Sequence, residues 1–156
     1  MIILGIDPGT VRVGYGVIEV TGRALKILDC GVIGDKNRGA AERLAYIGNE
    51  VRALIKKCRP DIIGVEQIYF SKNKKTAISV AEARGVIVFV AKSMEIPILE
   101  FTPSDIKSVV AGDGRCDKKS LRKMVAITLG VEKIDGPDDV SDALAIAIRA
   151  SFEGLK

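Results

Sequence analysis

The order of apolar patterns along the chain predicts an α/β fold with one mixed five-stranded sheet and helices on both of its faces. Three segments with strand-like patterns come first, at residues 2–7, 12–20 and 24–33, and they indicate three consecutive antiparallel strands. Strand and helix patterns alternate after that, which indicates parallel strands joined by helices. The length of 156 residues suits a single domain with its own core, so we expect one domain over residues 1–156.

The strands at the beginning of the chain have clear local signals. Residues 2–6 are apolar throughout, which is typical of a strand covered on both faces. Pro8 and Gly9 then favour a turn that takes the backbone out of the sheet. The segment Thr21-Gly22-Arg23 predicts a hairpin turn between the second and third strands.

The middle of the chain alternates between helix and strand. Apolar side chains at three- and four-residue spacing over residues 38–58 predict an amphipathic helix. A short strand is expected at 61–66, followed by a loop over 67–75 and a helix that ends near Met94. Residues 97–102 predict the fifth strand.

The last third of the chain is predicted to be helical, in three pieces near residues 103–110, 117–129 and 138–152. In the helix before the fifth strand, residues 85–91 are apolar on every side. A helix of this composition is buried on every side, so we expect this segment to lie in a core or an interface.

Two of the predicted strands end in a carboxylate. Asp7 ends the first strand and Glu66 ends the fourth, and ligands of open α/β sheets bind at the carboxyl ends of the strands. Asp139 and Asp142 lie three residues apart at the start of the last helix, so they share one helical face. The positive end of the helix dipole favours their ionised form. We therefore expect these four acids to converge on one site.

The residue types in the chain narrow the chemistry of that site. The chain has no histidine, and Cys30, Cys58 and Cys116 are odd in number and widely spaced, which argues against a disulfide framework and a zinc site. Catalysis would then depend on carboxylates, lysines or a metal ion. Mg²⁺ binds oxygen ligands, and two such ions held by four acids would catalyse an in-line phosphoryl displacement without a side-chain base.

Each acid also has an ordinary structural explanation. Asp7 could begin a turn, and Glu66 could be the solvated end of a strand. Asp138 or Asp139 could cap the last helix and interact with its dipole. The functional hypothesis therefore depends on the convergence of the acids rather than on any one of them.

Lysines gather before two of the predicted helices, where they oppose the helix dipole. Lys118 and Lys119 follow Asp117, a predicted N-cap, and Arg122 lies one turn further on. This arrangement suits phosphate binding, and the net charge of +4 is compatible with an anionic partner, although a solvated charged surface is the alternative. The other group combines lysines with aromatic rings that could stack on unpaired bases; it comprises Tyr69, Phe70, Lys72, Lys74 and Lys75.

Five segments resemble motifs of one family, the RuvC Holliday-junction resolvases of the ribonuclease H-like superfamily. They occur in the family's order and span nearly the whole chain. The segments are Ile-Asp-Pro-Gly-Thr at 6–10, Gly-Tyr-Gly at 14–16, Val-Glu-Gln at 65–67, Ala-Arg-Gly at 83–85 and Asp-Val-Ser-Asp-Ala-Leu-Ala-Ile-Ala at 139–147.

This resemblance implies a ribonuclease H-like fold and a Mg²⁺-dependent endodeoxyribonuclease. Such an enzyme cuts two symmetric strands of a four-way DNA junction during recombination and repair. The family's four catalytic and metal-binding acids match Asp7, Glu66, Asp139 and Asp142, and Mn²⁺ is expected to substitute for Mg²⁺. Asp138 lacks the motif's three-residue spacing to Asp142, so we assign it to capping or to solvent.

The resemblance also implies DNA contacts and protein partners. Lys107 and Lys118 match lysines near the family's active site that support DNA binding and catalysis. The helix that contains residues 85–91 corresponds to one near the family's dimer contact, so we expect a homodimer. In the family, the RuvA junction-binding protein and the RuvB branch-migration motor act together with the resolvase.

Three other functions compete with this interpretation. An actin-like ATPase or sugar kinase shares the Asp-Pro-Gly-Thr strand but needs a second nucleotide-binding half. A non-catalytic junction-binding module would need the lysines but not the acids, and another ribonuclease H-like nuclease would cut RNA in hybrids or in ribosomal precursors. The sequence shows neither a signal peptide nor a membrane-spanning segment, so we expect a cytoplasmic protein.

Overall fold

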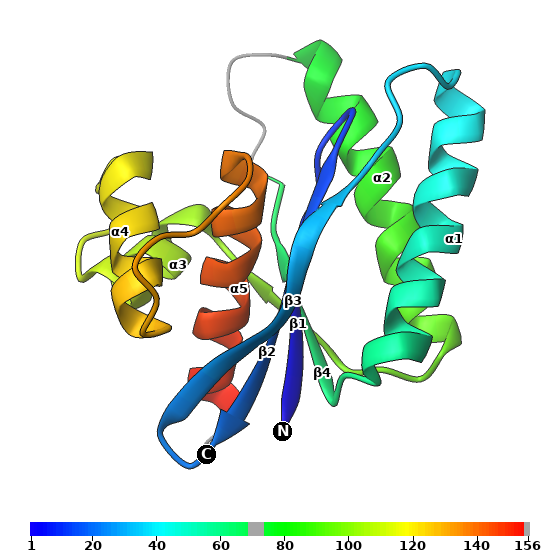
Figure 1. Cartoon of the computed structure of the whole chain (residues 1–156). Coiled ribbons are helices and arrows are strands. Elements are labelled where there is room, and N and C mark those ends of the chain that lie inside the picture. Colours follow the sequence, from blue (N-terminus) through cyan, green and yellow to red (C-terminus); the bar gives the residue numbers. More distant parts are fainter. Residues whose placement is uncertain (69–73, 155–156) are drawn as a thin grey trace.

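Five strands form one mixed sheet that lies between two layers of helices (Figure 1). The computed structural model describes residues 1–68 and 74–154. Across the sheet the strands follow the order β3-β2-β1-β4-β5. Their bounds are β1 (Ile2–Asp7), β2 (Val13–Thr21), β3 (Ala24–Ile33), β4 (Ile62–Glu66) and β5 (Ile98–Phe101).

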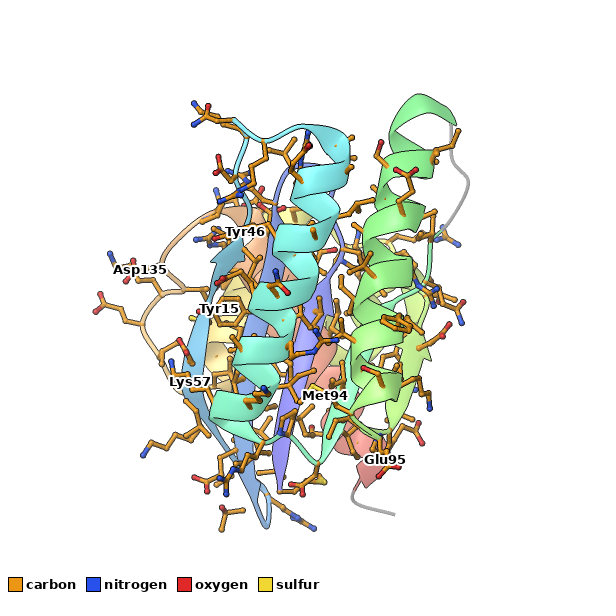
Figure 2. The ribbon with its side chains drawn as sticks, turned by 90° about the vertical axis from the view of Figure 1, so that its right-hand side faces the viewer. Tyr15, Tyr46, Lys57, Met94, Glu95 and Asp135 are labelled. Atoms are coloured by element: carbon orange, nitrogen blue, oxygen red, sulfur yellow. The ribbon has the colours of Figure 1, made fainter. Side chains whose placement is uncertain are left out.

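Helices α1 and α2 cover one face of the sheet, and α5 lies against the other face with α3 and α4 outside it (Figure 1). Figure 2 looks onto α1 and α2, which run side by side. Each layer encloses its own apolar core against the sheet. None of the helices that the structure describes combines the length and the apolar composition needed to cross a membrane. The helices are α1 (Ala40–Cys58), α2 (Lys74–Ser93), α3 (Pro103–Ala111), α4 (Lys118–Thr128) and α5 (Asp138–Gly154).

The strand pairings confirm the predicted mixed sheet. β1 pairs with β2 and β2 pairs with β3 in antiparallel fashion, whereas β1 with β4 and β4 with β5 are parallel. The bounds of the elements differ from the predicted ones by two residues at most. Gly22 has a φ of 60° in the predicted hairpin turn, a backbone conformation that glycine adopts without strain.

Alternation along the strands decides where the final carboxylates point. Leu4 and Ile6 of β1 belong to the core under α1 and α2, whereas Ile3 belongs to the core under α5. Because successive side chains of a strand point to opposite faces, Asp7 lies on the same face as Ile3. The residue before Glu66 belongs to the core under α1 and α2, so Glu66 also lies on the α5 face.

Helix α5 approaches the sheet closely because the strands present glycines to it. A β-carbon at Gly5 would overlap the backbone oxygen of Ala143, and one at Gly14 would overlap the backbone oxygen of Asp139. The small side chain of Ala147 also packs against Gly5. This packing places the first turn of α5 beside the carboxyl end of β1.

Within the single chain, the core does not bury residues 85–91 on every side, and the expected interface on their outer face stays a prediction. Ile87 and Ala91 are fully buried, but Phe89 is 67% exposed. Ile78 is 61% exposed and lies on the same side of α2, since about three helical turns separate the two residues. The apolar composition therefore gives α2 one buried face and one exposed apolar face.

Candidate active site

Asp7 and Glu66 lie next to each other where β1 and β4 end. The two strands are parallel and paired up to the residue before each acid, so the acids meet at the same edge of the sheet. Helix α5 begins at this edge (Figure 1), and its first five residues include Asp139 and Asp142. The predicted convergence of two strand ends and one helix start is therefore present.

Three of the four acids line a cleft of about 280 Å³. Asp7, Glu66 and Asp142 contribute carboxylates to it, whereas Asp139 is not among its lining residues. Lysines from α3 and α4 complete the cleft together with apolar side chains. These other lining residues are Pro103, Ile106, Lys107, Lys118 and Leu121.

Burial and mutual repulsion raise the pKa values of the acids in this cleft. The pKa of Asp7 rises to about 8, first because its carboxyl group is desolvated and then because of the charges of Glu66, Asp142 and Asp139. Desolvation is also the main reason that the pKa values of Glu66 and Asp142 are raised. The positive charge of Lys118 opposes all three shifts. The acids of the cleft therefore outnumber its two lysines, Lys107 and Lys118.

This donor set fits a hard divalent cation. Carboxylate oxygens are the ligands that Mg²⁺ prefers, and a cation would relieve the repulsion that raises the pKa of Asp7. In the part of the chain that the structure describes, no three acidic side chains stand close enough together to hold a metal ion as they are. Metal binding would therefore have to draw the carboxylates towards one another.

Lys118 and Lys107 reach the cleft from α4 and α3. Lys118 Nζ lies 3.1 Å from Asp142 Oδ2. Partial burial opposes the charge of Lys118, but Asp142 and Asp138 together raise its pKa above the ordinary value. Lys107 Nζ donates a hydrogen bond of 2.8 Å to the backbone oxygen of Cys116. The charge of Lys118, which opposes the dipole of α4, is therefore already partly balanced by Asp142 within the chain. It does not need an external anion for this.

The other residues predicted to contact DNA are described only in part. Lys119 is exposed at the start of α4 and does not line the cleft. Lys74 and Lys75 begin α2, and their side chains lie beyond the described part of the structure. The predicted residues that lie wholly outside the described ranges are Tyr69, Phe70 and Lys72.

Arg122 and Asp138 lie outside the cleft and fasten the segment that leads into α5. Arg122 Nη1 lies 3.1 Å from Asp138 Oδ1, and the side chain of Asp138 is 60% exposed. Arg122 Nη2 donates hydrogen bonds to the backbone oxygens of Ile134 and Gly136, at 2.6 and 2.7 Å. The expectation that Arg122 serves phosphate binding is therefore corrected, because its guanidinium is used inside the protein.

Two arginines that the sequence analysis missed contact the acidic residues. Arg12 Nη2 lies 3.0 Å from Asp139 Oδ2. Arg84 Nη2 lies 2.6 Å from a carboxylate oxygen of Glu100, and Arg84 Nε donates to the backbone oxygen of Glu66 at 3.4 Å. The Ala-Arg-Gly motif contains Arg84 and was a usable signal, whereas Arg12 carried none.

The sequence profile of the family described as Crossover junction endodeoxyribonuclease RuvC matches residues 3–150, nearly the whole chain. The chain belongs to the RuvC family. A RuvC relative from Moorella thermoacetica is 45% identical over 156 residues, which cover 97% of this chain and 92% of the relative. The resemblance seen in the motifs is thereby confirmed, and RuvC nucleases are metal-dependent endodeoxyribonucleases.

Solved RuvC structures from Thermus thermophilus share this fold. One has a TM-score of 0.90 and 30% identity, and the match covers 99% of this chain and 96% of the solved chain. Another is RuvC in complex with a Holliday junction substrate, with a TM-score of 0.91, 29% identity, and coverage of 99% and 94%. These matches confirm the ribonuclease H-like fold expected from the RuvC motifs.

Proposed function

We propose that this RuvC protein is a structure-selective endodeoxyribonuclease that resolves Holliday junctions by two symmetric nicks. Homologous recombination and DNA repair are the processes that require this reaction. The proposal is carried by the cleft in which Asp7, Glu66 and Asp142 face Lys107 and Lys118. Carboxylates that hold metal ions and lysines that contact phosphate are the two components of a metal-dependent phosphodiesterase.

The four acids Asp7, Glu66, Asp139 and Asp142 are proposed to hold two Mg²⁺ ions, for which Mn²⁺ can substitute. An oxygen-only donor set favours Mg²⁺, and bound ions would supply charge stabilisation for the attacking and leaving oxygens of an in-line displacement. The chain contains no histidine to act as a general base. The role of the acids would therefore be to position the ions against the scissile phosphate, and the bound ions would in turn keep the carboxylates ionised.

Lys107 and Lys118 are proposed to contact the DNA backbone beside the cleavage site. The side chain of Lys118 is 67% exposed although it pairs with Asp142, so it can turn towards a phosphate without unfolding α4. Further DNA contacts are proposed from the sequence, with one aromatic ring stacking on an unpaired base. These residues are Tyr69, Phe70, Lys72, Lys74, Lys75 and Lys119.

A homodimer is proposed because two symmetric nicks require two identical active sites. The exposed apolar face of α2, with Phe89 and Ile78, supports this assembly. Gly85 lies between them on the exposed side and leaves open space for a partner. The RuvA junction-binding protein and the RuvB motor are proposed as further partners from family membership, and a cytoplasmic location is proposed because it fits a nuclease that acts on DNA.

Cleavage of a synthetic four-way junction tests this function. The junction is compared with a linear duplex and an RNA–DNA hybrid, in Mg²⁺ and in EDTA, for the wild type, Asp139→Asn and Asp138→Asn. We expect paired symmetric nicks on the junction alone, and only with Mg²⁺. Asp139→Asn should lower the rate at least about 100-fold, whereas Asp138→Asn should retain cleavage because its side chain lies outside the cleft.

Each other outcome contradicts a particular part of the proposal. Cleavage of the hybrid or the duplex would mean a different nucleic-acid substrate at the same metal site. A junction that is bound but never cut would mean a non-catalytic binding module. Full activity of Asp139→Asn would remove that residue from the proposed set of metal ligands.

A further inference from the structure

Arg12 forms an ion pair that sets Asp139 apart from the other three acids. Arg12 Nη2 lies 3.0 Å from Asp139 Oδ2, and the side chain of Asp139 is 25% exposed. Asp7, Glu66 and Asp142 line the cleft, but Asp139 does not. The carboxylate bound by arginine is therefore the one that stands outside the cleft.

The backbone of Arg12 is held in place while its side chain is not. Gly9 packs so closely against the backbone oxygen of Arg12 that a β-carbon there would overlap it. A β-carbon at Gly34 would lie 3.0 Å from the α-carbon of Arg12, and Arg43 Nη1 donates a hydrogen bond of 3.0 Å to the backbone oxygen of Thr10. The side chain of Arg12 is nevertheless 54% exposed, so the guanidinium can change partners without a backbone movement.

The position of Asp139 is equally well defined by its backbone. Its backbone oxygen packs against Gly14 of β2, two residues after Arg12. Its negative charge also adds to the repulsion that raises the pKa values of Asp7 and Asp142. Turning the Asp139 carboxylate fully into the cleft would increase that repulsion unless a cation were present.

We propose that Arg12 is a positioning residue that holds Asp139 at the edge of the cleft and exchanges it for a DNA phosphate when metal and DNA bind. This inference rests on the proposed function, because it takes Asp139 as a metal ligand. Exposed ion pairs are weak, so a divalent cation can compete for the carboxylate. The released guanidinium suits a phosphate, which accepts two parallel hydrogen bonds from arginine.

The first test is a Mn²⁺ titration of the DNA-free protein. The electron paramagnetic resonance signal of free Mn²⁺ measures how much of the metal is bound. Arg12→Gln removes the competing charge, so we expect Mn²⁺ to bind about two- to fivefold more tightly than in the wild type. Arg12→Lys keeps the charge and should return the affinity towards the wild-type value. A purely structural role of Arg12 would not give tighter metal binding.

Arg38→Gln is the matched control for this titration. Arg38 is also an exposed arginine in an ion pair, with its Nε 3.1 Å from Asp35 Oδ2, and its loss changes the net charge equally. We expect Arg38→Gln to bind Mn²⁺ as the wild type does. Equal affinity of Arg12→Gln and the wild type, or an equal gain in Arg38→Gln, would overturn the proposal.

The second test measures junction binding against salt concentration in Ca²⁺ buffer. If Arg12 contacts a phosphate in the complex, Arg12→Gln should reduce the slope of log affinity against log salt by about 1. An unchanged slope would overturn the exchange. Failure of either test leaves junction cleavage by the wild type intact, whereas failure of the proposed function would appear in the wild type itself.

Discussion

Near its start, helix α5 brings Asp142 into a cleft with Asp7 and Glu66, whereas near its end it carries Arg149 in a network of opposite charges. In the cleft, carboxylates face carboxylates, and burial together with repulsion raises the pKa of Asp7 to about 8. The exposed side chain of Lys118 compensates only one part of this charge.

At the other end, Arg149 has two partners of opposite charge. Arg149 Nε lies 2.9 Å from Asp105 Oδ2, and Arg149 Nη1 lies 3.0 Å from Glu153 Oε1. The guanidinium carbon also lies 4.5 Å from the centre of the Phe101 ring. The arginine side chain is only 13% exposed, whereas the side chains of Asp105 and Glu153 are 38% and 34% exposed, so these contacts are partly shielded from water.

The acids at the two ends of α5 therefore differ in their effect on stability. Those around Arg149 support the fold, whereas those in the cleft destabilise it and serve function. Removing one partner of a partly buried ion pair is costly, because the other charge is left without compensation. Several carboxylates without enough positive charge cost stability until a cation arrives. The same helix therefore supports structure at one end and chemistry at the other.

Among the variants that test this difference between the two ends of α5, Asp7→Asn should change activity and stability most. We expect junction cleavage to fall at least about 100-fold, because one proposed metal ligand is lost. The free energy of unfolding of the metal-free protein should rise by about 2–4 kcal/mol at pH 7.5, because asparagine is neutral in both states, whereas Asp7 must bind a proton or bury its charge on folding. Urea unfolding and junction cleavage measure the two effects on one preparation.

The pH dependence of stability tests whether the cleft destabilises the ionised form of Asp7. The folded-state pKa of Asp7, about 8, lies above the ordinary value of 3.8, so the folded protein binds the proton more tightly than the unfolded chain. Stability is then highest below pH 3.8 for this group and is lost as the pH rises through 8. Asp7→Asn should remove most of this loss in metal-free buffer. An identical pH slope in the two proteins would contradict the crowding of charge in the cleft.

Asp105→Asn is expected to act in the opposite direction. It makes the same chemical change as Asp7→Asn, but it removes the charged partner of Arg149. We expect the free energy of unfolding to fall by about 1–2 kcal/mol while junction cleavage stays near the wild-type rate. Stabilisation by Asp105→Asn, or loss of cleavage in a folded variant, would break the distinction between the two ends of α5.

Lys118→Ala should produce the smallest of the three effects. Cleavage is expected to fall about tenfold, and the salt slope of junction binding should decrease by about 1. Stability should change little, because the pair with Asp142 is largely exposed on the lysine side. Lys133→Ala is the control, since Lys133 pairs with Asp135 on the exposed surface outside the cleft. Similar salt slopes in both variants would mean that Lys118 makes no phosphate contact and is an ordinary solvated lysine.

Local patterns predicted most of the fold because each depends on residues close in sequence. Short apolar runs placed Asp7 and Glu66 at the ends of strands, and the helical spacing placed Asp139 and Asp142 in the first turns of α5. The N-cap of α4 also followed from local chemistry, since the Asp117 carboxylate accepts a 2.7 Å hydrogen bond from the Ser120 amide.

The surroundings of the charged residues could not be predicted in the same way. Arg122 and Lys118 look alike in the sequence, as cations in the first turns of α4, yet one anchors backbone oxygens and the other reaches the cleft. Phe89 of the apolar helix α2 is likewise exposed. Its burial depends on which elements pack against each face of the helix. Composition alone does not contain that information.

The sequence by itself determined the order of elements, the edge of the sheet where the acids gather, and membership of the RuvC family. Only the tertiary structure decided that Arg12 would pair with Asp139 and that three other acids would share the cleft. The reason is that periodicity acts within one element, whereas these contacts depend on how α5 docks. That docking is set by the close approach of α5 to glycines such as Gly5 and Gly14, on strands far from α5 in the sequence.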